Sequence, residues 1–308
     1  MIILKYMKIL LTFLGTSSAI PTKTRNHSSI FLKYKDENIL IDCGEGTQRQ
    51  IRIAGINPCS ITRLLITHFH GDHVFGLPGL FQTLALNNYN KTLFIYVPKN
   101  TKKYINEIFK TFVPVKKIKY EVREVSGKFF ETKDFFLQAI PLDHDTSTNG
   151  YIFQEKDKLR INKEKLKKLN IPEKTPELAK LVQGKNIKIK NKLINYKSLT
   201  YKQKGKKISF IFDTKLCSNV KKLAENSDLA VIESTFLSNT DKGNDLSKEY
   251  KHLTAKQAAE IAKKNNIKQL ILTHISQRYE KNPALLLEEA KKVFKNTIIA
   301  NDFDRIEV

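Results

Sequence analysis

The chain has 308 residues, of which 41% are hydrophobic and 28% are charged, and these proportions indicate a globular protein rather than a disordered one. Lysine interrupts the apolar runs, which are too short to cross a bilayer, so we expect no membrane-spanning segment and no membrane partner. The 54 Lys and Arg residues outnumber the 31 Asp and Glu residues, and the net charge of +23 favours a polyanionic partner.

Short apolar runs predict a series of strands with helices between some of them. In the first half of the chain we expect strands at 9–14, 29–34, 38–41, 63–67, 93–97, 120–125, 135–141 and 151–154. Helices are expected after Thr47 and at 100–111. Later strands are expected at 207–212, 229–233, 269–273 and 297–300, and later helices at 254–265 and 283–294. This mixture predicts a layered α/β domain, with residues 1–308 forming one folded unit.

Two features bear on the compartment of the protein. The three cysteines lie far apart and form no Cys-x-x-Cys pair, so neither a disulfide framework nor a cysteine-rich zinc site is predicted, and a cytoplasmic location fits best. Residues 1–14 are apolar, but Lys5 and Lys8 interrupt them and no small-residue cleavage site follows. We therefore expect a buried strand there rather than a signal peptide.

The helix expected at 254–265 has the clearest local signals. Thr254 stands where an N-cap residue would, because a threonine hydroxyl can accept a hydrogen bond from the first turn. The spacing of its apolar residues predicts an inner face formed by Ala258, Ala259, Ile261 and Ala262.

Residues 155–207 form a basic insertion. They include 18 Lys or Arg residues and five Asp or Glu residues, so about a sixth of the chain carries 13 of the 23 net positive charges. A short helix is expected at 163–169 and a basic hairpin at 186–201. Charge runs are usually solvated surface, and the alternative is an arm that binds phosphates. The candidate RNA-binding residues in this segment are Lys163, Lys167, Lys168 and Lys185.

The densest chemical signal is the run Thr-His-Phe-His-Gly-Asp-His at 67–73, which follows an apolar strand. In an extended segment, residues two apart point the same way, so His68 and His70 can bind one ion. The glycine that follows turns the chain and directs Asp72 and His73 towards a second ion. A lone histidine after a strand is usually structural, but this cluster favours a metal site.

Further candidate ligands follow later apolar strands. Three imidazoles with a shared carboxylate for one ion, and two imidazoles with a carboxylate and the same shared group for the other, suit zinc. We therefore predict two Zn²⁺ per subunit, with the metal ligands His68, His70, Asp72, His73, His144, Asp213 and His274.

These residues carry a resemblance to a known family. The run His-x-His-x-Asp-His, followed by a later His, Asp and His, resembles the metallo-β-lactamase superfamily. Motifs similar to those of the ribonuclease Z family are the run at 15–26, which ends in Pro-Thr-Lys-Thr-Arg-Asn at 21–26, Asp-Cys-Gly-Glu-Gly-Thr-Gln at 42–48, Gly-Leu-Pro-Gly-Leu at 76–80, Glu-Ser-Thr at 233–235 and His-Leu-Thr at 252–254. They occur in the expected order and span nearly the whole chain.

The resemblance implies the metallo-β-lactamase fold, a four-layer αββα sandwich, with residues 155–207 as an inserted tRNA-binding arm. It also implies a zinc-dependent endoribonuclease, acting as a homodimer, that removes the 3′ trailer from precursor tRNA. The products would be a tRNA with a 3′-hydroxyl and a trailer with a 5′-phosphate. Glu173 and Lys174 stand where the family's arm usually has Gly-Pro, so the geometry of the arm can differ.

The resemblance also implies roles for individual side chains. Asp72, a metal ligand, is a candidate general base. His252 would donate a proton to the leaving oxygen, and Glu233 would orient the imidazole of His252. Lys23 and Arg25 would bind phosphates near the 3′ end of the substrate. The alternative is a surface histidine before a helix and two ordinary surface cations.

Two other functions remain open from the sequence. One is a hydrolase of the same fold that acts on small phosphodiesters or esters, which the 21–26 motif and the basic insertion disfavour. The other is a catalytically inactive RNA-binding protein. Inactivity normally accompanies lost ligands, whereas every expected ligand is present in this chain.

Overall fold

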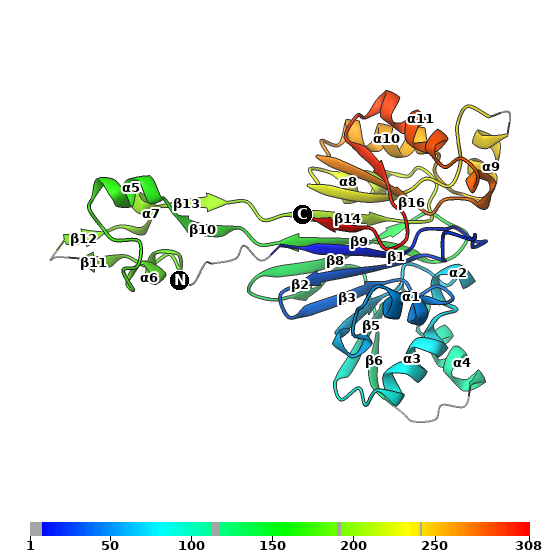
Figure 1. Cartoon of the computed structure of the whole chain (residues 1–308), viewed down its shortest axis with the longest axis horizontal. Helices are drawn as coiled ribbons and strands as arrows, with labels where there is room; N and C mark the ends of the chain where they lie inside the picture. The colour runs from blue at the N-terminus through cyan, green and yellow to red at the C-terminus, as the bar shows by residue number, and fades with distance from the viewer. Residues whose placement is uncertain (1–7, 113–117, 190–191, 241) are drawn as a thin grey trace. The chain divides into compact units, whose positions relative to one another are not determined.

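The computed structural model describes residues 8–112, 118–189, 192–240 and 242–308 (Figure 1). Residues 1–7 of the predicted N-terminal strand lie outside the described residues. Among the described residues, every helix is too short or too polar to span a bilayer. Contacts divide the chain into two compact units, the first formed by Met1–Phe130, Leu137–Phe153 and Lys207–Val308, and the second by Glu131–Phe136 and Gln154–Lys206.

The first unit contains two large sheets. The first sheet has the order β18-β1-β2-β3-β4-β5-β6. Its strands are β1 (Leu10–Gly15), β2 (Ser29–Tyr34), β3 (Glu37–Ile41), β4 (Arg63–Leu65), β5 (Thr92–Val97), β6 (Lys119–Glu124) and β18 (Arg305–Glu307). The strands from β18 to β3 pair antiparallel, and those from β3 to β6 pair parallel.

Helices cover one face of this sheet, as Figure 1 shows. They are α1 (Thr47–Ile53), α3 (Leu77–Leu86) and α4 (Lys102–Thr111), with the short helices η1 (Pro58–Ser60) and α2 (Gly71–Val74) in the connections. Ile51, Leu80 and Ile105 of the helices join Leu64 and Ile95 of the strands in one buried apolar cluster. This burial fixes the carboxyl ends of β3 and β4 against the helices.

The second sheet has the order β17-β16-β15-β14-β9-β8-β7. Its strands are β7 (Gly127–Glu131), β8 (Phe135–Leu142), β9 (Thr148–Glu155), β14 (Lys207–Ile211), β15 (Leu229–Glu233), β16 (Gln269–Thr273) and β17 (Thr297–Ile299). Strands β14 to β17 are parallel. The helices that follow these strands are α8 (Ser218–Ala224), α9 (Gly243–Glu249), α10 (Ala255–Lys264), η2 (Gln277–Tyr279) and α11 (Ala284–Val293).

The two sheets face one another through aromatic side chains. The ring of Tyr34 on β2 lies 5.3 Å from the ring of Phe153 on β9, and Tyr96 on β5 lies 4.6 Å from Phe129 on β7. Helices α8, α10 and α11 cover the outer face of the second sheet (Figure 1). The layers are therefore helix, sheet, sheet and helix, and the predicted αββα sandwich is confirmed.

Helix α10 forms as its sequence predicts. The Thr254 hydroxyl accepts a hydrogen bond from the backbone N–H of Gln257 at 3.2 Å, and the Gln257 side chain accepts one from the N–H of Thr254 at 2.9 Å. This reciprocal pair is a capping box, which stabilises the helix start. The four apolar residues of the predicted inner face are all buried.

Two predicted elements differ from the structure. The strand expected at 63–67 ends at Leu65, because the N–H of Thr67 donates to the Asp42 carboxylate at 2.7 Å rather than to a neighbouring strand. The hairpin expected at 186–201 is shorter: β11 (Ile187–Ile189) pairs with β12 (Lys192–Ile194), and the rest of the segment forms other elements.

The second unit has a small core of its own. Strand β10 (Lys158–Ile161) pairs antiparallel with β13 (Thr200–Gln203). The helices are α5 (Lys163–Lys168), which confirms the helix expected at 163–169, α6 (Leu178–Leu181) and α7 (Tyr196–Leu199). The buried residues are Leu166, Ile171, Leu178, Leu181, Ile187 and Leu199. Apolar residues occupy this core, and the exposed surface includes Lys163, Lys167, Lys168 and Lys185.

Candidate metal centre

The histidine-rich run follows the carboxyl end of β4, which lies between β3 and β5 in the first sheet. His68 is fully buried, and α2 (Gly71–Val74) starts at the glycine where a turn was expected. Asp72 and His73 lie on α2, and both are buried. The extended segment and the short helix therefore present their donors in two directions, as the sequence spacing predicts.

Four side chains form the first group of donors. They are His68, His70, His144 and Asp213, and their ligand atoms lie within 4.8 Å of one another. Asp213 Oδ2 lies 3.5 Å from His68 Nε2 and 3.9 Å from His144 Nε2. His144 Nε2 lies 3.2 Å from His70 Nδ1. Segments that are far apart in sequence therefore supply one cluster of three imidazoles and a carboxylate.

The second group consists of Asp72, His73, His274 and again Asp213. Asp72 Oδ2 lies 3.3 Å from both His73 Nε2 and His274 Nε2. Asp213 Oδ1 lies 3.3 Å from His274 Nε2, and its Oδ2 lies 3.5 Å from His73 Nε2. The structure thus brings all seven predicted side chains together, and Asp213 is the carboxylate common to both groups.

One hydrogen-bond network orients two of the imidazoles. The Asp42 carboxylate accepts from His73 Nδ1 at 2.7 Å and from the Thr67 hydroxyl at 2.8 Å. Because the hydroxyl of Thr67 donates to Asp42, it accepts from His68 Nδ1, which is 3.1 Å away. The Nδ1 atoms of both imidazoles are therefore held by these partners, and the Nε2 atoms face the cluster. Asp42 had no predicted role, although a carboxylate directly after a buried strand was a signal for one.

A second network orients His274 and His144. The Thr235 hydroxyl donates to Glu233 Oε2 at 2.7 Å, so it accepts from His274 Nδ1 at 3.0 Å. His144 Nδ1 lies 3.2 Å from the backbone oxygen of Lys251, to which it donates. Both imidazoles therefore turn Nε2 towards the cluster. Thr235 was also missed from the sequence, since its hydroxyl acts only through tertiary contacts.

The donor chemistry fits a divalent metal. His68 Nε2 and Asp213 Oδ1 are buried and have no hydrogen-bond partner among the described residues. Burial and the neighbouring His73 lower the pKa of His68 well below its usual value, so His68 is neutral. Burial opposes ionisation of Asp213, but His274 and His73 outweigh it and hold the pKa of Asp213 well below its ordinary range. A neutral imidazole and an ionised carboxylate with unsatisfied atoms are a metal-binding set.

Three residues around the centre have left-handed backbone conformations. Asp42, Asp213 and His274 have φ angles of 57°, 29° and 59°, and each stands just after a strand. Such angles are uncommon for residues other than glycine and cost about 1–3 kcal/mol each. The surrounding sheets hold this strain, which turns the side chains out of the strand direction and into the cluster.

His252 lies beside the cluster with a carboxylate partner. Its Nδ1 lies 2.9 Å from Glu233 Oε2 and its side chain is 14% exposed. Glu233 is fully buried and also accepts from the backbone N–H of Thr214 at 2.7 Å. Burial disfavours the imidazolium form, but the carboxylates of Glu233 and Asp213 outweigh burial and raise the pKa of His252 to about 9. His252 is therefore a partly accessible proton donor.

A cavity of about 330 Å³ opens beside these groups. It is lined by Ala19, His70, Gly71, Asp72, Phe75, Asp213, His252 and His274. Members of both donor groups and the His252 imidazole therefore face one space, so a phosphate or ester in it could contact all of them.

Comparison with known proteins gives the family. The chain is 39% identical over 299 residues to the ribonuclease Z of Methanothermobacter thermautotrophicus, and the match covers 96% of each protein. The chain belongs to the ribonuclease Z family. It is therefore an enzyme, and the predicted family and enzyme class are confirmed.

Solved structures agree with this family assignment. The human short form of tRNase Z matches with a TM-score of 0.69 and 27% identity, covering 96% of this chain and 98% of the human chain. The metallo-β-lactamase-fold protein YhfI from Bacillus subtilis matches with a TM-score of 0.68 over 98% of this chain and 100% of its own, but its 17% identity supports the fold alone. A family described as anti-Pycsar protein Apyc1 matches residues 9–157, which is less than half of this ribonuclease Z family member.

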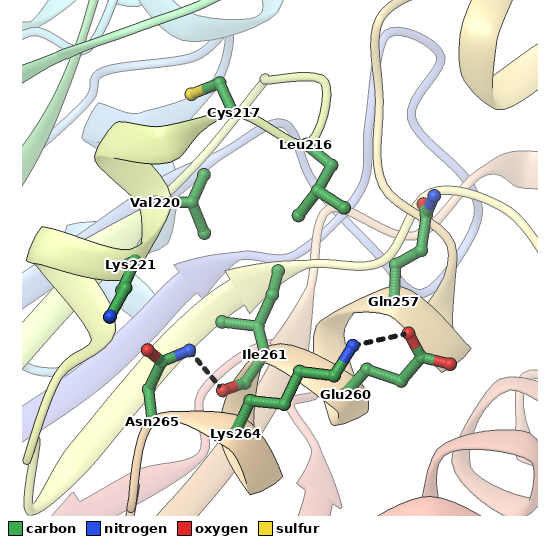
Figure 2. Close-up of a pocket in the computed structure, with 9 residues that line it drawn as sticks. All are labelled: Leu216, Cys217, Val220, Lys221, Gln257, Glu260, Ile261, Lys264 and Asn265. Carbon is green, nitrogen blue, oxygen red and sulfur yellow. Dashed lines mark hydrogen bonds and ion pairs between the residues drawn. The ribbon is translucent and has the colours of Figure 1, made fainter.

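A second cavity of about 330 Å³ lies between α8 and α10 (Figure 2). Its floor is apolar, with Leu216, Val220 and Ile261. Figure 2 shows Lys264 paired with Glu260, and the Asn265 amide donating to a backbone oxygen. The lining contains no imidazole and none of the donor groups, so we place the chemistry at the first cavity.

The structure places the two predicted phosphate-binding residues differently. Lys23 is exposed, whereas Arg25 is only 5% exposed. The Arg25 guanidinium donates to the Thr16 hydroxyl at 2.7 Å, to the Asn301 side chain at 2.7 Å and to the backbone oxygen of Ala300 at 2.5 Å. These bonds join the 21–26 motif to the end of β1 and to the connection between β17 and β18, so the geometry favours a structural role for Arg25 in this ribonuclease Z. The phosphate contact of Lys23 stays a prediction.

Replacing Arg25 with Ala is expected to lower the free energy of unfolding by about 3 kcal/mol, because the buried oxygens of Thr16 and Ala300 lose their donor. Urea denaturation would measure the loss, with Lys23→Ala as a control that changes stability by less than about 0.5 kcal/mol. If Arg25→Ala instead weakened RNA binding and left stability unchanged, the residue would contact phosphate after all.

Proposed function

We propose that this protein is a zinc-dependent endoribonuclease that removes the 3′ trailer from precursor tRNA. The observation that carries the proposal is the meeting of seven metal-type donors with the His252–Glu233 pair at one cavity. The relatives that bear the name ribonuclease Z, and the human tRNase Z with a similar structure, support tRNA as the substrate.

Two zinc ions per subunit would be held by the two donor groups, with Asp213 common to both. When bound, zinc would lower the pKa of a water molecule towards neutrality and would neutralise negative charge on the phosphoryl oxygens. Nitrogen and oxygen donors of this kind are the usual ligands of catalytic zinc. That the ions are zinc, and that there are two of them per subunit, is part of this proposal.

The chain's own groups would move the protons. Burial opposes the ionised form of Asp72, but His73 and His274 outweigh it and hold the pKa of Asp72 below its ordinary value, so this carboxylate is ionised. Asp72 lines the cavity and is the candidate acceptor for the proton of the attacking water. His252 would donate a proton to the leaving 3′ oxygen. Glu233 would position the imidazole through the bond to Nδ1. The products would be a tRNA with a 3′-hydroxyl and a trailer with a 5′-phosphate.

The basic insertion at 155–207 would act as an arm that binds the tRNA body. Its candidate phosphate contacts, Lys163, Lys167, Lys168 and Lys185, are all exposed, although Lys163 also pairs with Glu173 at 2.8 Å. Double-stranded RNA is recognised mainly by shape and backbone, which suits a lysine-rich surface. The homodimer and the cytoplasmic location stay predictions.

Neutralising the four arm lysines to Gln is expected to weaken precursor-tRNA binding by about 10- to 100-fold and to lower the slope of log affinity against log salt by up to about 3. Filter binding at several salt concentrations would measure both. The matched control neutralises four exposed lysines on or next to the outer helices, namely Lys263, Lys291, Lys292 and Lys295. Equal losses in the two variants would remove the special role of the insertion.

The function itself is tested with a 3′-extended tRNA transcript. Mapping the cut and the end groups would establish the substrate class, the cleavage position and the product chemistry together. A panel of small phosphodiesters and esters tests the rival hydrolase. Binding of the transcript without any cleavage would favour the inactive RNA-binding protein and contradict the proposal.

A further inference from the structure

Phe75 is an exposed aromatic side chain at the border of the metal centre. It is 66% exposed, and it lines the same cavity as Asp72, His252 and His274. Because the ring is mostly exposed, it adds little to the stability of the folded chain, and it is not one of the metal-type donors. The exposed ring is therefore available to a bound molecule.

The position of Phe75 relative to the donors is fixed by local contacts. The residue ends α2, and its backbone N–H donates to the oxygen of Gly71 at 2.9 Å. The ring packs directly on Gly71, because a Cβ built there would lie only 2.2 Å from Cε2 and 2.3 Å from Cζ of the ring. The same short helix carries Asp72 and His73. The ring and two candidate ligands are thus parts of one rigid turn.

A second apolar group borders the cavity from another segment. Ala19 lines it, and the neighbouring Ile20 is 52% exposed. This segment is also held in place, since the Ser17 hydroxyl donates to the backbone oxygen of Ile20 at 2.7 Å. The cavity therefore combines donors suited to a phosphate with an apolar border.

We infer that Phe75 stacks on a nucleobase next to the scissile phosphate, an inference that rests on the proposed function. A phosphodiester in the cavity carries a nucleoside on each side, so a base must lie within reach of the groups at its border. An aromatic ring binds any base through its face, without reading sequence. Phe75 would thus place the single-stranded end of the RNA relative to the donors, whatever its sequence.

Replacing Phe75 with Ala is expected to raise the KM for precursor tRNA by about 5- to 100-fold while kcat and the metal content change little. Phe75→Tyr keeps the ring and should restore a KM close to that of the wild type. The matched control is Phe112→Ala, which removes another exposed phenylalanine that is 52% exposed and does not line the cavity.

Fluorescence reports the stacking directly. RNAs carrying 2-aminopurine as the last nucleotide kept or the first nucleotide removed would be mixed with enzyme, and quenching recorded before cleavage. One of the two labels should be quenched by the wild type and by Phe75→Tyr, but not by Phe75→Ala. Equal quenching with Phe75→Ala, or an unchanged KM, would overturn the inference.

Two further outcomes have distinct meanings. If Phe75→Ala changed the molecular mass of the enzyme in size-exclusion chromatography and its KM followed protein concentration, the ring would belong to a contact between copies of the chain and the stacking inference would be wrong. If the wild type left precursor tRNA intact, the proposed function would fail first. Normal wild-type cleavage with an unaffected Phe75→Ala variant would remove only this inference.

Discussion

Replacing Asp213 with Ala is expected to remove bound metal and to lower the cleavage rate by at least about 10³-fold, since metal ions contribute several kcal/mol to charge stabilisation in the transition state. Asp213 is the carboxylate common to both donor groups, so its loss should weaken both sites at once. His68→Ala removes one imidazole of the first group and should release metal from that group first. Metal analysis after gel filtration, with single-turnover cleavage, would measure both effects.

The control for this experiment is Asp143→Ala. Asp143 directly precedes the candidate ligand His144 in the sequence, but its carboxylate pairs with Lys215 at 3.0 Å and belongs to neither donor group. This variant should keep the metal and most of the activity. An Asp213→Ala protein that retained its full metal content would refute the assignment of the ligands.

The second large effect is expected at His252. Because general acid catalysis contributes about 10²- to 10⁴-fold, His252→Ala should slow single-turnover cleavage by a factor in that range while the protein keeps its metal. The imidazole has its own partner in Glu233 and belongs to neither of the two groups that together contain the seven predicted donors. Metal content separates this variant from Asp213→Ala. Unchanged single-turnover rates across the pH range would remove His252 from the reaction.

The positions of most strands could be predicted because the strands are short apolar runs that end at polar residues. The ends of a strand could not be predicted where a side chain takes the backbone hydrogen bond that a neighbouring strand would otherwise make. At Thr67 the backbone N–H bonds to Asp42, a residue 25 positions earlier, and the strand ends before it. In the insertion, β13 (Thr200–Gln203) pairs with β10 (Lys158–Ile161), and the pattern within 186–201 contains no sign of that distant partner.

Some residues of the candidate site could be predicted from the sequence, and others could not. His68, His70, Asp72 and His73 are readable because they lie within six residues, where local geometry already fixes their directions. The downstream donors His144, Asp213 and His274 were predicted from their places after apolar strands. Asp42 and Thr235 were missed, since each acts on an imidazole that only the folded chain brings near.

Arg25 marks the limit of motif reading. The motif predicted that Arg25 contacts phosphate. In the structure its guanidinium is buried and donates to Thr16 and to residues near the end of the chain, Ala300 and Asn301. No local pattern around Arg25 contains this information. An arginine in a family motif can therefore stabilise the segment that borders a site instead of touching the substrate.

The most direct test of the account is anomalous diffraction at the zinc edge from crystals of the protein grown with zinc. We expect two peaks, one beside His68, His70 and His144 and one beside Asp72, His73 and His274, with Asp213 next to both. Maps without a peak among these side chains, or with zinc bound only elsewhere, would contradict the account.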